Sequence, residues 1–315
     1  MIYRYGEIKK KRASYHDVIR GLRRFLDKNQ NAAATRFLAL WQKQRKAVDE
    51  DEIIRWLENG NVPEEVVQQW RKRYDGFAWE EMLLLWNEAA REAARIGLKK
   101  LAVDADLPYK ELQAWTETHA AEFVTHMTDQ QRNAINEVIQ RAIRDGMDVT
   151  ATAKILRPMI GLYPAQAKAV LNHYRHVTDS LQRAYPNIKA DTLQQRAQKA
   201  SERYAQGRRR YRANMIARTE LCGAYNAGMQ QTVKTLVDVG ELGVMMKAAL
   251  TAGDYGEKEG VKYDNRTCAL CREVDHDWIP LNSKYVVGGV EYDAPPFHPH
   301  CRCVEIFEEI IPPVR

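Results

Sequence analysis

Cysteine and histidine side chains gather near the carboxyl end of the chain, although the whole sequence has only five cysteines and eight histidines. Cys268 and Cys271 form a C-x-x-C motif, and His298 and Cys301 form an H-x-x-C motif after a gap of 26 residues. Two donors at this spacing fit around one tetrahedral ion, and thiolate and imidazole are ligands that Zn²⁺ prefers. The sequence therefore predicts a Zn²⁺ site made of these four side chains.

The role of such an ion depends on how many ligands the protein supplies. Four ligands close the coordination sphere, so the ion would be structural and would hold together a tail too short for its own core. His300 and Cys303 can each substitute for one of the four. If water took one position, the site would be hydrolytic, with His300 or Glu273 as the base. Two further interpretations stay open: buried structural thiols with surface histidines, and another metal or a redox pair.

Basic residues form two clusters whose chemistry suits phosphate groups. Residues 1–46 carry thirteen Lys and Arg against three acidic residues, and residues 196–218 carry eight against one. Residues 250–315 are acidic, with seven Lys and Arg against twelve Asp and Glu. One interpretation is that these stretches bind DNA without sequence preference, by neutralising phosphates. The other is that they are solvated surface, because consecutive residues of a helix point in different directions and do not form one binding face. The nucleic-acid-binding candidates are Lys9, Lys10, Lys11, Arg12, Arg208, Arg209, Arg210 and Arg212.

The elements that must position these residues fall into three regions. Residues 1–128 read as a helical N-terminal region that can bind a partner, and residues 129–249 as a helical core. Residues 250–315 are richer in proline and form a small module. Within it, residues 284–292 are two β-favouring runs around a Gly-Gly pair, which predicts a hairpin, and residues 301–307 predict one more strand. The fold class is therefore mainly α, with a small C-terminal α+β module that contains the predicted zinc site.

Capping residues set the expected helix boundaries in the central region. Thr128 and Asp129 can each cap a helix start, and Gly146 ends that helix. A polar helix is expected over 189–206 and a separate helix over 213–239.

The helix over 213–239 has two faces with different signals. Small residues lie along one face and predict close packing against another helix. Thr219, Cys222 and Asn226 share a second face, which is either a catalytic constellation or a set of hydrogen-bonded packing residues with Cys222 as a buried thiol. We favour packing, because polar residues inside helical bundles are usually hydrogen-bonded. The first face comprises the small residues Ala217, Ala224 and Gly228, together with Leu221.

Several classes of protein are disfavoured because their signals are missing. No apolar run approaches the length that spans a membrane, and the charged N-terminus does not resemble a secretory signal. The chain has no P-loop, dinucleotide-binding fingerprint or serine nucleophile elbow. We therefore expect a protein that stays in the cytoplasm where it is made, has no membrane partner and keeps its thiols reduced.

Three blocks of the sequence together resemble the C-terminal half of the phage Mu F-type head morphogenesis proteins, also called minor capsid or minor head proteins. The blocks are "ANMIARTELCGAYNAG", "NRTCALCREVD" and "PPFHPHCRC", and they follow one another in that family's order and spacing. The resemblance extends over about residues 130–307. The chain departs from the family pattern at Asp277, where a glycine is usual, and in a longer, more charged approach to Cys268.

The resemblance implies a virion protein that takes part in head, or procapsid, assembly and is not an enzyme. Members are made in the cytoplasm of the infected bacterium and packaged inside the head. Their implied partners are the portal protein, the inner capsid or scaffold, and packaged double-stranded DNA bound without sequence preference. The alternative is a zinc-dependent hydrolase or nuclease acting on nucleic acid or peptide, and a free-standing DNA-binding regulator is a third candidate.

Overall fold

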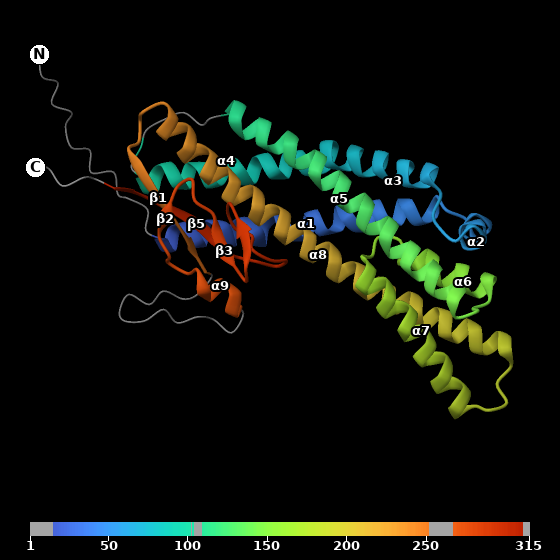
Figure 1. The fold of residues 1–315 in the computed structure, drawn as a ribbon. Helices are drawn as coiled ribbons and strands as arrows, with labels where there is room; N and C mark the ends of the chain where they lie inside the picture. Colours follow the sequence, from blue (N-terminus) through green and yellow to red (C-terminus); the bar gives the residue numbers. More distant parts are fainter. Residues whose placement is uncertain (1–14, 102, 104–108, 252–266, 311–315) are drawn as a thin grey trace, which may run out of the picture. The chain divides into compact units, whose positions relative to one another are not determined.

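The described part of the chain is mainly helical, and the strands in it lie toward the carboxyl end, which confirms the predicted fold class (Figure 1). The computed structural model describes residues 15–101, 103, 109–251 and 267–310, so the basic segment Lys9–Arg12 lies outside it. Among the described residues, no helix is both long enough and apolar enough to cross a bilayer. The helices are α1 (Tyr15–Lys46), α2 (Glu50–Asn59), α3 (Glu64–Phe77), the π-helix η1 (Ala78–Met82), α4 (Leu83–Leu101), α5 (Tyr109–Arg144), α6 (Val149–Leu156), the 3₁₀ helix η2 (Arg157–Met159), α7 (Pro164–Ala184), α8 (Ala190–Asp238) and α9 (Ala269–Glu273). The strands are β1 (Val244–Leu250), β2 (Ile279–Pro280), β3 (Tyr285–Val287), β4 (Val290–Tyr292) and β5 (Val304–Ile310).

Contacts group the chain into two compact units, each built from separate stretches of sequence. The first unit comprises the described residues of Met1–Asn31, Leu83–Glu117 and Ile216–Arg315, and the second those of Ala32–Met82 and Thr118–Met215. Helices α1, α5 and α8 contribute residues to both units. The three consecutive regions inferred from composition remain a prediction about how the sequence is organised.

The second unit has a continuous apolar core built from amphipathic helices. In α3, Trp70, Tyr74 and Phe77 recur every three or four residues, and all three are buried. This spacing places them on one helix face, as the sequence predicts. Trp70 meets Trp56 of α2 edge to face, with 5.9 Å between the ring centroids. The functional residues of the C-terminal module belong to the first unit.

Several helix boundaries differ from those expected. Helix α5 runs straight through Thr128, which is buried and satisfies its hydroxyl by donating to the Val124 carbonyl, 2.7 Å away, instead of capping a new helix. The two helices expected around Gly207 are one helix, α8. The helical prediction also fails from Val244 onward, where β1 begins. The stop at Gly146 is confirmed, because α5 ends two residues earlier and Gly146 adopts a positive φ of 61°.

The strands form one three-stranded antiparallel sheet and one hairpin. The sheet order is β2-β1-β5, and β1 pairs with β5 from Val244↔Ile310 to Leu250↔Val304. The hairpin joins β3 to β4 through Gly288 and Gly289, whose φ values are 57° and 79°. A two-residue turn of this kind requires positive φ at both positions, which glycine adopts without strain. The structure therefore confirms the predicted hairpin and the strand at the carboxyl end.

The small-residue face of α8 packs closely against α4, as expected. A Cβ atom added at Gly228 would collide with the backbone Cα and carbonyl oxygen of Ala90. Ala89, Ala90, Ala93 and Ala94 of α4 are all buried, so the contact depends on small residues on both helices.

We expect Gly228→Ala to lower the free energy of unfolding by about 1–3 kcal/mol, because the neighbouring backbone cannot move aside as a side chain can. Gly207→Ala on the same helix is the matched control. Gly207 has open space around its Cα and is expected to gain up to about 1 kcal/mol from the better helix propensity of alanine. Denaturant unfolding measures both changes, and equal effects would contradict the packing argument.

Candidate metal centre

The first half of the Cys/His cluster is positioned by the short helix α9. Cys268 caps its amino end, and the Cys271 backbone N–H donates to the Cys268 sulfur at 3.3 Å. One helical turn therefore aims both thiols at the same point. The second half comes from the segment between β4 and β5, where the Cys301 N–H donates to the His298 carbonyl at 3.1 Å and forms a tight turn. Both halves belong to the first unit.

The structure brings all four predicted ligands together. The His298 Nε2 atom lies 3.0 Å from the sulfurs of both Cys268 and Cys271, and the Cys271 and Cys301 sulfurs are 3.9 Å apart. Ligand atoms around a tetrahedral Zn²⁺ lie about 3.4–3.8 Å apart, given Zn–S and Zn–N bonds of about 2.3 and 2.0–2.1 Å. Cys268, Cys271 and His298 are close to this spacing, whereas Cys301 groups with Cys271 and Cys303, so its side chain would have to move to complete a set of four ligands.

The protonation of the cluster also suits a cation. Hydrogen bonds from Cys271, then from Cys303 and His298, hold the pKa of the Cys301 thiol well below its usual range. The hydrogen bond with Cys301 in turn raises the pKa of His298 to about 9. The other ring nitrogen of His298, Nδ1, lies 2.8 Å from the Pro299 carbonyl and can donate to it, which leaves Nε2 to face the sulfurs. A thiolate paired with an imidazolium is a place where a metal ion can replace the proton.

Of the two possible substitutes, Cys303 joins the cluster and His300 does not. Two groups of three donors have their ligand atoms within 4.8 Å of one another: Cys268, Cys271 and His298 form one, and Cys271, Cys301 and Cys303 the other. Cys271 is common to both. Among the described residues, the cluster thus offers five donors and can hold a metal ion.

His300 is turned toward α8. Its backbone N–H donates to the Thr219 hydroxyl at 3.2 Å, and its φ is 65°. Burial, reinforced by the charge of Arg218, lowers the pKa of its ring. Glu273, the other base considered for a hydrolytic site, is exposed at the end of α9.

The polar face of α8 holds the ligand-bearing segment in place. The Asn226 side-chain N–H₂ donates to the carbonyls of Cys222 and Cys303, both at 3.0 Å, and its oxygen accepts from the Glu305 N–H at 2.7 Å. The buried Cys222 thiol donates to the same Cys303 carbonyl at 3.5 Å, and burial raises its pKa well above the usual range. The predicted packing role of this face is confirmed.

The sequence did not predict a buried ion pair between strands β1 and β5. The Lys247 ammonium of β1 lies 3.6 Å from the Glu305 carboxylate of β5, and the two side chains are 1% and 0% exposed. Lys247 also donates to the Asp293 carbonyl at 2.6 Å, and the Tyr285 hydroxyl donates to Glu305 at 3.1 Å. Burial raises the pKa of Glu305 to about 7 and lowers that of Lys247, while each partner opposes the shift of the other. The sequence feature that could have indicated a buried charge is the single lysine within the apolar run "VMMKAAL".

The basic run of α8 is not a continuous surface. Arg209 is buried and donates to the Pro158 carbonyl. Arg212 is fully buried, donates to the Gln130 side chain at 2.7 Å and lies 5.3 Å from the centre of the Trp41 ring. These two arginines are therefore structural, which corrects their place among the phosphate-binding candidates. Arg210 is exposed and Arg208 is half-buried, so both remain candidates.

The fold and the site together define a mainly helical protein with a small α+β module built around a Cys/His cluster. Comparison of the chain with protein-family models, with characterised proteins and with solved structures finds no match.

Proposed function

We propose that the Cys/His cluster holds a structural Zn²⁺ ion through Cys268, Cys271, His298 and Cys301. Three thiolates and one imidazole form a soft donor set, which binds Zn²⁺ in preference to Mg²⁺ or Ca²⁺. Bound zinc would supply cross-links between α9 and the segment before β5. Cys301 and Cys303 both group with Cys271, and the assignment takes Cys301 as the fourth ligand because its thiol is hydrogen-bonded to His298.

Burial of the donors favours a structural ion over a hydrolytic one. Cys271 and Cys301 are 3% and 1% exposed, and they form part of the small core of the module together with Tyr285, Val287 and Phe297. A catalytic zinc needs an open coordination position that water and substrate can reach. Cys268 and His298 are only half-buried, but four protein donors fill a tetrahedral coordination sphere and leave no such position.

We expect Cys268→Ser to weaken metal affinity by about 100-fold or more, because it removes a direct ligand. Cys303→Ser should leave the affinity nearly unchanged, since it removes only the neighbouring thiol. Competition with a chromophoric chelator measures both variants under reducing conditions. The reverse result would place the ion in the group formed by Cys271, Cys301 and Cys303.

We infer that the protein acts as a minor head protein of the phage Mu F type, a structural protein of head assembly. The observation that supports this most is the way the three family-like sequence blocks meet. Asn226, in the first block, bonds to Cys303 and Glu305, at and just after the end of the third block, and the second block supplies Cys268 and Cys271. Segments that are far apart in sequence thus form one module, as expected if the three blocks belong to a single structural unit.

In this proposal the protein is made in the cytoplasm of the infected bacterium and packaged inside the head. Its partners are the portal protein and the inner capsid or scaffold. Packaged double-stranded DNA lies nearby, and exposed basic residues such as Arg210 contact it without sequence preference. The protein has no catalytic role, in contrast to the alternative of a zinc-dependent hydrolase or nuclease.

A binding assay with the purified portal protein of the same phage tests this function. The full-length chain should remain bound to immobilised portal through a salt wash and should appear in purified heads by mass spectrometry. The Lys168→Gln variant, which loses one exposed charge on the second unit, is the control for non-specific attachment. Absence from both portal and heads would overturn the proposal, and nuclease or peptidase activity lost in Cys271→Ser would favour the enzyme instead.

A further inference from the structure

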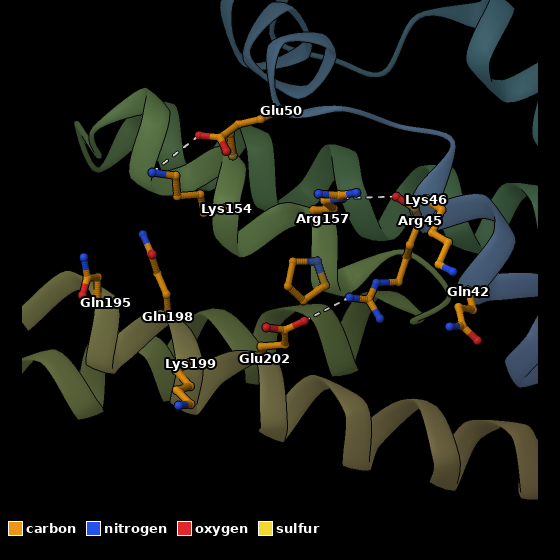
Figure 2. Close-up of a pocket in the computed structure, with 12 residues that line it drawn as sticks. Gln42, Arg45, Lys46, Glu50, Lys154, Arg157, Gln195, Gln198, Lys199 and Glu202 are labelled. Atoms are coloured by element: carbon orange, nitrogen blue, oxygen red, sulfur yellow. Dashed lines mark hydrogen bonds and ion pairs between the residues drawn. The ribbon is translucent and has the colours of Figure 1, made fainter.

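A basic cleft lies in the second unit, and no candidate metal ligand lines it. It has a volume of about 440 Å³ and is formed by the end of α1, the start of α2, α6 with η2, and the first half of α8. On α8, Gln195, Gln198, Lys199 and Glu202 follow one another at helical spacing and line one wall. Figure 2 shows these side chains along α8 and those of Glu50 and Lys154 on the opposite side.

Positive charge exceeds negative charge in this cleft. Five cations line it (Arg45, Lys46, Lys154, Arg157 and Lys199) against two acids (Glu50 and Glu202), which leaves a net charge of +3. Arg45 pairs with Glu202 at 3.1 Å and Lys154 with Glu50 at 3.6 Å, so both acids are engaged.

The remaining three cations differ in how they are held. Arg157 donates to the Arg45 carbonyl at 3.2 Å, which fixes its side chain across the end of α1 (Figure 2). Lys46 and Lys199 are exposed and form no ion pair within the described part of the chain. Their ammonium groups can therefore turn toward a ligand without first breaking an ion pair.

A further cation lies behind the cleft wall. Arg209 is buried and donates to the carbonyl of Pro158, which itself lines the cleft. Burial, together with the like charge of Arg45, lowers the pKa of Arg209 to about 10. Glu202 offsets part of the charge of these two guanidinium groups, and the net charge of the lining leaves a positive potential that attracts an anion.

We propose that this cleft binds a ligand that carries two or more adjacent phosphate groups. Phosphate oxygens only accept hydrogen bonds, and the lining offers ammonium, guanidinium and side-chain amide donors, the amides from Gln42, Gln195 and Gln198. A net charge of +3 requires more than one negative charge to balance it, which favours neighbouring phosphates over a single carboxylate. The volume is within the range of about 300–1,000 Å³ that is typical of small-ligand sites.

Such phosphates can come from a free polyphosphate or nucleotide, or from the phosphodiester chain of a nucleic acid. Isothermal titration of the full-length protein with inorganic pyrophosphate and with ATP tests the first source, and fluorescence anisotropy with a labelled single-stranded oligonucleotide tests the second. The proposal predicts saturable binding in at least one arm. Affinity should fall as salt rises, because each phosphate contact displaces bound counterions.

The double variant Lys46→Gln/Lys199→Gln is expected to weaken that binding by about tenfold or more, because it removes two charge-assisted hydrogen bonds. The matched control is Lys168→Gln, an exposed lysine of α7 that does not line the cleft and should bind as the unaltered protein does. All of these residues are exposed, so thermal unfolding should be unchanged in both variants.

Tight pyrophosphate or ATP binding with weak oligonucleotide binding would identify a free polyphosphate as the ligand, and the opposite ranking would identify a nucleic-acid backbone. Equal binding of a poly-glutamate peptide would overturn the phosphate assignment. The proposal also fails if no arm binds, or if the double variant and Lys168→Gln behave alike. The metal-binding module contributes no residue to the cleft, so this test is independent of the proposed zinc site.

Discussion

Cys271→Ser is expected to abolish tight metal binding and to unfold the C-terminal module while the rest of the protein stays folded. Cys271 is the one side chain common to both groups of donors, so neither group survives its loss. The module has only a small apolar core of its own, and metal-binding energy of about 10–16 kcal/mol stabilises comparable small zinc domains. The second unit retains its separate core of buried helices and should keep its helical signal.

Metal analysis after gel filtration should give about one zinc ion per unaltered chain and almost none in the variant. Hydrogen exchange measured by mass spectrometry should show loss of protection confined to the strands of the module. Cys222→Ala is the matched control, because Cys222 is also a buried thiol of the first unit but belongs to neither donor group. A reduced, metal-free protein with a fully protected module would contradict the structural role of the ion.

Lys247→Met is expected to lower the free energy of unfolding by about 3–5 kcal/mol at pH 8. The substitution keeps the length and apolar stem of the side chain but leaves the Glu305 carboxylate buried without its cationic partner. Lys247 helps to hold the pKa of Glu305 down to about 7, so its loss raises that pKa further, and the variant must either bury the charge or take up a proton. The cost of the substitution therefore grows as the pH rises above 7. Denaturant unfolding of the holoprotein, followed by a probe of the C-terminal strands, measures the loss.

Two comparisons separate the buried charge from a general effect of removing lysine. Lys284 pairs with Glu291 on the hairpin at 3.4 Å, but their side chains are 52% and 65% exposed, so Lys284→Met should cost less than about 1 kcal/mol. The double variant Lys247→Met/Glu305→Leu removes both buried charges and should recover most of the lost stability. If Lys247→Met and Lys284→Met lowered the free energy of unfolding equally, the buried pair would contribute no more to stability than the exposed one.

The sequence was sufficient for features that depend on neighbouring residues. The C-x-x-C and H-x-x-C spacings identified the donors that the structure places together, because one turn of chain aims two side chains at one point. Gly288 and Gly289 predicted the hairpin because few other residues adopt positive φ at both turn positions. The stop at Gly146 followed from the same backbone property.

Long-range contacts decided what the sequence pattern could not. Residues of β1 were predicted to be helical, and β1 is a strand because it pairs with β5, which lies more than fifty residues further along the chain. Arg209 and Arg212 resembled a basic surface, yet neighbouring helices bury them around the Pro158 carbonyl and the Gln130 side chain. Cys303 joins the cluster because Asn226 fixes its backbone.

Local spacing therefore determined the donor types, the turn and most of the helical content of this protein, because these follow from backbone geometry within a few residues. Tertiary structure alone decided which charges are buried, how the donors divide around Cys271, and that Lys247 meets Glu305. The physical reason is that burial and pairing depend on the free energy of contacts between distant segments, which no short window of sequence contains.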